Sequence, residues 1–154
     1  QASNKLTRPN LLAAEIRAFL CLDKLLPDFI IDDHVFKPYG YSLNAIKGEK
    51  YLTIHVTPQA DSSYISFESN VNLVTLSTIF LAVLSPKSFD IISFNENNFD
   101  DFLKQHIPSD YVSKSLVSDK LTNGYLVNYA NFIRPEKVFT KPVNINLNED
   151  NHTL

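Results

Sequence analysis

The residues best suited to chemistry in this sequence lie between positions 36 and 70. A serine and a histidine, Ser42 and His55, stand there among apolar residues. Histidine takes up and releases a proton near neutral pH, so it can act as a general base on a group within hydrogen-bonding reach. Whether the two residues form one site depends on whether the fold brings them together.

Three segments of this region, 39–46, 51–57 and 63–68, alternate polar and apolar residues. The turn sequences KGEK and PQAD separate them. Alternation with a period of two, interrupted by polar turns, predicts an antiparallel meander of three strands.

The length of the first turn sets which residues face each other. If KGEK is a four-residue loop, Ile46 faces Tyr51 and Ser42 lies opposite His55 on one face. The β-carbons of such a pair are roughly 4.5–5.5 Å apart. If PQAD is also a four-residue loop, the next strand adds polar residues to the same face: Tyr64, Ser66 and Glu68.

The pattern alone leaves several interpretations of this polar face open. It could be an ordinary solvent-facing sheet surface, a ligand-binding face or a proton-transfer site. A serine hydrolase is disfavoured, because Ser42 sits inside a strand and no G-x-S-x-G elbow exposes it.

The rest of the chain predicts further helices and strands around the meander. A helix over 11–26, capped by Asn10, would bury a stripe made of Leu12, Ile16, Phe19, Leu20 and Cys21. The later elements are a helix over 72–84, a strand over 88–94, a helix over 97–107, and a hairpin of 113–118 with 125–133 around Asn123-Gly124. This order predicts an α+β fold, an antiparallel β-sheet with helices packed on one face.

Composition limits the class of protein. With 154 residues and 44% hydrophobic content, the chain suits one compact domain, here expected over 1–134 and followed by a polar, flexible tail over 135–154. The net charge of -3 gives no reason to expect nucleic acid or a membrane as partner. One cysteine excludes an internal disulfide and fits a reducing, cytoplasmic setting, and no metal-ligand spacing is present.

Three motifs carry a resemblance to a known family: FKPYGYSLN (36–44), YLTIHVTPQ (51–59) and SYISFESN (63–70). In order and spacing they resemble eukaryotic S-adenosylmethionine decarboxylase. The resemblance implies one half of a four-layer αββα sandwich. It also implies an activity, the decarboxylation of S-adenosylmethionine to the aminopropyl donor for spermidine and spermine. The cofactor of that family is a pyruvoyl group, which the proenzyme makes from a serine by cutting its own backbone and which forms a Schiff base with the substrate.

The resemblance also assigns roles to residues of this chain. Ser42 and His55 match the serine and histidine of self-processing, and Phe36 matches the ring that stacks on adenine. The residues that match the region where putrescine activates many members are Glu68, Phe94 and Tyr125; for the two aromatic residues, core packing is the competing interpretation.

Two positions depart from the family pattern. Gln59 stands where the family has a glutamate that binds the ribose hydroxyls, which removes the charge-assisted part of that contact. Tyr39 replaces the usual cysteine before Gly-Tyr-Ser. Both changes support an alternative function, a catalytically inactive paralogue that binds and regulates an active decarboxylase. A sheet-surface binding module related to the family only in structure is a third interpretation.

No segment of the sequence resembles the self-cleavage site or the proton-donating cysteine, and Cys21 precedes the matching motifs. The chain also contains no methionine. We therefore expect the C-terminal portion of an α-chain, incomplete as an enzyme alone. Its expected partners are S-adenosylmethionine and the missing N-terminal segment or β-chain of the same proenzyme. Putrescine is a candidate activator and a second copy of the chain a candidate partner.

Overall fold

The computed structural model describes residues 12–59 and 61–136. Its helices are α2 (Ala13–Phe19), α3 (Leu22–Leu25), α4 (Val74–Leu84) and α5 (Phe99–His106). Its strands are β1 (Ile30–Val35), β2 (Tyr41–Lys47), β3 (Lys50–Thr57), β4 (Tyr64–Ser69), β5 (Ser88–Phe94), β6 (Val112–Lys120) and β7 (Leu126–Ile133). No helix within this described part is long and apolar enough to cross a membrane.

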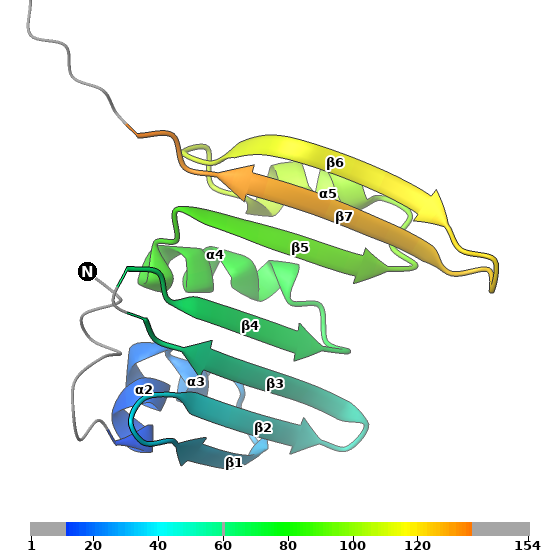
Figure 1. Cartoon of the computed structure of the whole chain (residues 1–154). Helices are drawn as coiled ribbons and strands as arrows, with labels where there is room; N and C mark the ends of the chain where they lie inside the picture. Colours follow the sequence, from blue (N-terminus) through cyan, green and yellow to red (C-terminus); the bar gives the residue numbers. More distant parts are fainter. Residues whose placement is uncertain (1–11, 60, 137–154) are drawn as a thin grey trace, which may run out of the picture.

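The strands form two antiparallel sheets, and the helices lie on one face of them (Figure 1). The first sheet has the order β1-β2-β3-β4, and the second has the order β5-β7-β6. The predicted α+β class is confirmed, although the strands are hydrogen-bonded as two sheets and not as one. The predicted hairpin around Asn123-Gly124 is the pair β6 and β7.

The register between β2 and β3 agrees with the prediction. Ile46 pairs with Tyr51 and Ser42 pairs with His55. The turn is tighter than expected, because Lys47 also pairs with Lys50 and only two residues remain between the strands. One of them, Gly48, has φ of +61°, a conformation that glycine adopts without steric cost.

The connection between β3 and β4 is longer than the expected four residues. Thr57 pairs with Tyr64 and His55 with Ser66, so the loop covers 58–63 and the predicted register was wrong by two residues. Side chains alternate between faces with a period of two, so an even shift leaves each side chain on its predicted face. Ser66 and Glu68 therefore still share the face of Ser42 and His55.

The sequence pattern did not identify β1 as a strand. Residues 30–35 pair with β2 along their whole length, with His34 opposite Ser42 and Asp32 opposite Asn44. Two adjacent aspartates and an exposed Ile30 obscure the alternation that usually marks a half-buried strand.

The predicted helix over 11–26 is broken into α2 and α3. Cys21 adopts a left-handed conformation, with φ of +57°, between the two short helices. Leu12, which was assigned to the buried stripe, is 65% exposed. The predicted cap Asn10 and residues 137–154 of the predicted tail lie outside the described residues.

The core consists of two clusters on the helical face of the sheets. The first joins β2 and β3 to the N-terminal helices, with Leu43 and Ile54 fully buried. The second joins α5 to β7 through residues such as Leu103 and Ala130. Helix α4 contributes to both, since Phe80 belongs to the first cluster and Leu81 to the second. The opposite face of β2 and β3 carries mainly polar side chains, with Ile46 exposed near the end of β2.

Candidate functional site

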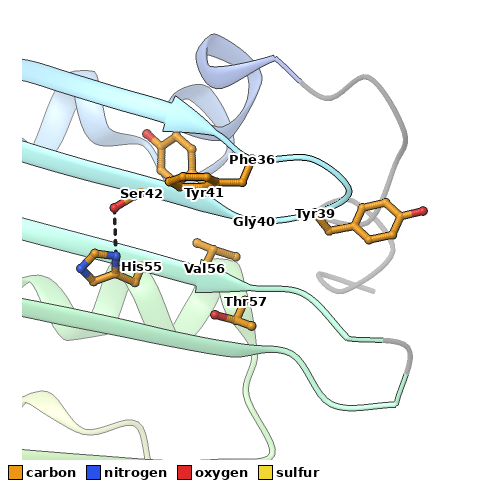
Figure 2. Close-up of a pocket in the computed structure, with 8 residues that line it drawn as sticks. All are labelled: Phe36, Tyr39, Gly40, Tyr41, Ser42, His55, Val56 and Thr57. Carbon is orange, nitrogen blue, oxygen red and sulfur yellow. Dashed lines mark hydrogen bonds between the residues drawn. The ribbon is translucent and has the colours of Figure 1, made fainter.

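A pocket of about 320 Å³ opens where β1 leads into β2 and beside the end of β3. Figure 2 shows the side chains around it. Its lining consists of Phe36, Tyr39, Gly40, Tyr41, Ser42, His55, Val56 and Thr57. The two strands that carry the first two sequence motifs therefore converge on one space.

Ser42 and His55 are joined by a hydrogen bond at this pocket. The distance between Ser42 Oγ and His55 Nδ1 is 2.9 Å, and Figure 2 marks the bond. Which atom donates depends on the tautomer of the imidazole. If Nδ1 carries the proton, it donates to Ser42 Oγ and leaves Nε2 free to accept a proton. The hydroxyl proton of Ser42 is then also free to donate to a third group. The sequence-based expectation that these two residues meet is confirmed.

Phe36 reaches the same pocket from the loop that follows β1. Its backbone N–H donates a hydrogen bond of 2.9 Å to the carbonyl oxygen of Gly40, which closes the loop. Gly40 has φ of +147°, and a β-carbon built there would lie 3.4 Å from Phe36 Cβ. The ring is 49% exposed, so part of it is free to contact a ligand.

Tyr41 anchors β2 from the helical side of the sheet. Its hydroxyl donates a hydrogen bond of 2.9 Å to Asp33 on β1, and Arg17 on α2 forms an ion pair of 3.3 Å with the same carboxylate oxygen. Burial, together with the hydrogen bond to Asp33, raises the pKa of Tyr41 far above its ordinary value. This triad fixes the strand next to Ser42. The sequence pattern did not predict it, because β1 was not identified as a strand.

Glu68 lies on the same sheet face as the Ser42–His55 pair but in the neighbouring row. It pairs with Thr53 on β3, while His55 pairs with Ser66. Its side chain is exposed. Thr53 Oγ1 in turn donates a hydrogen bond of 3.2 Å to Asn44. The acidic group thus belongs to a polar surface adjoining the pair.

The two residues that depart from the family pattern lie outside the centre of the pocket. Gln59 is exposed in the loop after β3 and does not line the pocket; its backbone N–H donates to Ser63 Oγ at 3.4 Å. Tyr39 is at the rim, and its ring points away from Ser42 and His55 (Figure 2). The bulk of Tyr39 therefore does not fill the space between Phe36 and the pair.

Phe94 and Tyr125 belong to the second sheet. Their rings meet edge to face with centroids 6.5 Å apart, and both side chains are exposed. Plain core packing, the competing interpretation of these residues, is therefore wrong. In Figure 1, β5 ends on the side of the molecule where β2 ends, whereas the pocket lies at the other end of β2. The structure does not bring these rings to the pocket.

A histidine that the sequence pattern did not single out lies beside the same site. His34 on β1 pairs with Ser42, so its side chain shares the polar face. The ring of His34 contacts the ring of Phe36. Recognising residues 30–35 as a strand that pairs with β2 would have identified this histidine.

Comparisons with known proteins agree with the motif resemblance. The sequence model of the adenosylmethionine decarboxylase family matches residues 2–133. A Trypanosoma cruzi S-adenosylmethionine decarboxylase proenzyme is 33% identical over 142 residues, which cover 83% of this chain and 38% of that protein. The Drosophila melanogaster proenzyme is 56% identical over 54 residues, 34% of this chain and 15% of that protein.

A solved structure agrees with the family match. The crystal structure of a Trypanosoma brucei AdoMetDC-delta26 monomer superposes with a TM-score of 0.72 at 25% identity, covering 88% of this chain and 60% of that one. The fold is therefore that of the α+β sandwich proteins to which that structure belongs. The chain itself is a member of the adenosylmethionine decarboxylase family. It spans much less than two thirds of the length of the curated relatives it matches.

Proposed function

We propose that this chain supplies part of the active site of a decarboxylase acting on S-adenosylmethionine, and that a segment outside this sequence carries the reactive group. The observation that carries the proposal is the Ser42–His55 hydrogen bond of 2.9 Å, formed in a pocket beside Phe36 in a member of this family. The relative lengths support it, since the aligned part covers 38% of the Trypanosoma cruzi proenzyme.

In this proposal Ser42 and His55 act in self-processing of the proenzyme. The tautomer with a proton on Nδ1 serves both residues at once, because His55 Nε2 becomes a base and Ser42 becomes a donor. The hydroxyl of Ser42 then stabilises an oxygen that gains negative charge at the cleavage site. His55 removes the proton whose loss completes backbone cleavage.

The polar part of the pocket lining suits a pyruvoyl group. The hydroxyls of Ser42 and Thr57 and the imidazole of His55 supply hydrogen-bonding groups for keto oxygens. When present, such a group supplies the electron sink for loss of carbon dioxide from an amino acid. Ser42 and His55 are the residues of this chain that would lie beside it.

Substrate binding in this proposal uses the other wall of the pocket. The exposed part of the Phe36 ring stacks on the adenine, because a flat aromatic face suits a purine. A sulfonium cation also gains from nearby aromatic rings. Gln59 would bind the ribose hydroxyls through neutral hydrogen bonds only, and it would have to reach them from the loop after β3.

A separate region of the same face would bind an activating diamine. Glu68 offers an exposed carboxylate, and Phe94 with Tyr125 offers two exposed rings that can contact a cation or its methylene chain. Because these rings lie away from the pocket, putrescine would act on the reaction indirectly. A second copy of the chain as partner remains part of this proposal.

Self-processing is the most direct test. In the full-length gene product we expect His55→Ala to slow backbone cleavage by roughly 10²–10⁴-fold, the range for loss of a general base. Asn44→Ala, a change on the same strand face as Ser42, is the matched control and should process normally. Gel separation of precursor and products, with intact mass for the blocked N-terminus, gives the rate. Normal cleavage of His55→Ala would contradict the role.

The substitution at Gln59 favours the second candidate function, a regulatory paralogue. Carbon dioxide release from carboxyl-labelled S-adenosylmethionine separates the two functions. The processed protein alone should release carbon dioxide if it is a decarboxylase. A paralogue would release none by itself and would change the rate of an active decarboxylase mixed with it.

A further inference from the structure

His34 makes a ring contact with Phe36 that the proposed function does not use. The two ring centroids are 4.8 Å apart and the planes meet at 72°, an edge-to-face arrangement. Such pairs are favourable because the electropositive edge of one ring meets the electronegative face of the other. The contact joins His34, near the end of β1, to the wall of the pocket.

The neighbours of Phe36 explain why this contact matters. The loop that carries the ring is exposed at Lys37, Pro38 and Tyr39. Gly40 approaches Phe36 from within the loop, with its ideal β-carbon position 3.6 Å from Phe36 Cδ2. His34 provides a second contact from the strand, so the ring is held by a rigid element as well as by its own loop.

His34 lies next to Ser42, but its ring contacts a different residue. The two residues are paired across β1 and β2, which leaves Ser42 between two histidines. The hydrogen bond of Ser42 goes to His55, and the ring of His34 packs against Phe36. His34 is therefore placed to act on the aromatic wall and not as a second base.

We propose that His34 is a positioning residue, which holds the Phe36 ring in one orientation so that its exposed part receives a flat aromatic group such as a purine. The proposal rests on the proposed function of Phe36. Fixing a free side chain on binding costs affinity, and a ring that is already fixed avoids this cost. The role needs an aromatic ring at position 34 and not the titration of a histidine.

The test compares His34→Leu, which removes the ring at similar size, with His34→Phe, which keeps it. Asp32→Ala is the control, because Asp32 lies on the same strand and face. Adenosine binding to each full chain is measured by calorimetric titration. We expect His34→Leu to bind about threefold to tenfold more weakly, and His34→Phe and Asp32→Ala to bind like the unmodified chain.

A ligand-free readout checks the same role. In the unmodified chain, nuclear Overhauser contacts and ring-current shifts between His34 and Phe36 should be present. They should be absent in His34→Leu while the amide signals of β1 and β2 stay in place, and restored by the ring in His34→Phe. A general loss of those strand signals in His34→Leu, together with failure of His34→Phe to restore binding, would assign His34 a structural role and overturn the proposal.

The outcomes separate this inference from the proposed function. Equal adenosine affinity in His34→Leu and the unmodified chain, with weaker binding in Phe36→Leu, would overturn the role of His34 and leave the purine site standing. If neither the unmodified chain nor Phe36→Leu bound adenosine, the purine site would be excluded, and the inference that rests on it would be excluded too.

Discussion

The hydroxyl of Tyr41 donates a hydrogen bond to Asp33 on the face of the sheet opposite to Ser42. Neighbouring residues of β2 thus serve different ends: Tyr41 holds the strand to the helices through Asp33 and Arg17, and Ser42 faces the pocket. Adjacent side chains of a strand point to opposite faces. Holding Tyr41 against the helices therefore also holds Ser42 toward the pocket.

This anchor predicts a loss of stability at high pH. Burial and the bond to Asp33 raise the pKa of Tyr41 above its ordinary value near 10, so the folded state favours the neutral phenol. Its contribution is complete below about pH 10 and declines as the pH rises further, because only the unfolded chain then releases the proton. Above pH 10, the free energy of unfolding of Tyr41→Phe in urea should decline less steeply with pH than that of the unmodified chain.

Below that range the same variant reports the bond itself. Tyr41→Phe should lower the free energy of unfolding at pH 8 by about 1–3 kcal/mol, since Asp33 loses a buried donor. Tyr64→Phe, a change at a 65% exposed ring, is the matched control and should leave it unchanged. Equal stability of Tyr41→Phe and the unmodified chain at pH 8 would show that the anchor contributes nothing.

Glycine positions predict a contrast between two loops. Gly40→Ala forces an L side chain to φ of +147° beside Phe36, whereas Gly48→Ala meets no atom within 4 Å at φ of +61°. Gly48→Ala should cost about 1–2 kcal/mol of unfolding free energy and leave adenosine binding intact. Gly40→Ala should weaken adenosine binding as well, which calorimetric titration measures. Binding equal to that of Gly48→Ala would argue against a role for this loop in holding the ring.

The core of the first sheet predicts a large effect from one buried side chain. Ile54 is fully buried on the helical face of β3, while Ile46 on β2 is 52% exposed. Ile54→Ala should lower the free energy of unfolding by about 2–5 kcal/mol, because the lost contacts leave a cavity. Ile46→Ala should cost much less. Denaturant unfolding compares them, and similar losses would place the core elsewhere.

The proposed diamine region predicts a selective effect of one carboxylate. Under the proposed function, Glu68→Gln in the full-length gene product should reduce stimulation by putrescine and leave the unstimulated rate of decarboxylation close to normal, because the carboxylate lies outside the pocket. Asp32→Asn removes a charge in the same row of the sheet and is the control. Unchanged stimulation in Glu68→Gln would exclude the carboxylate from the diamine site.

The sequence predicted the part of the site that depends on local pairing. A short turn between two alternating segments leaves few registers, so the meeting of Ser42 and His55 followed from position alone. The family resemblance then supplied the candidate role of Phe36, which periodicity does not show.

Contacts made by an unrecognised strand could not be predicted in the same way. Asp33 and His34 belong to a strand whose polar residues disguise it, so their contacts with Tyr41 and Phe36 were not expected. The length of the loop over 58–63 was also misjudged, because Pro58 and the polar residues after it fit several turn lengths. The break at Cys21 was not predicted because the residues on both sides favour a helix, so local propensity does not indicate the left-handed residue between α2 and α3.

Helix α4 places neighbouring residues in two cores, with Phe80 stacked on Phe67 at 4.3 Å beneath the first sheet and Leu81 in the cluster beneath the second. Because α4 packs under both sheets, its detachment from one sheet would also expose apolar surface of the other. The two halves of the described chain are therefore expected to melt in a single cooperative transition. A ligand that binds only at the Ser42–His55 end would then raise the melting temperature of the distant β5-β7-β6 sheet by the same amount.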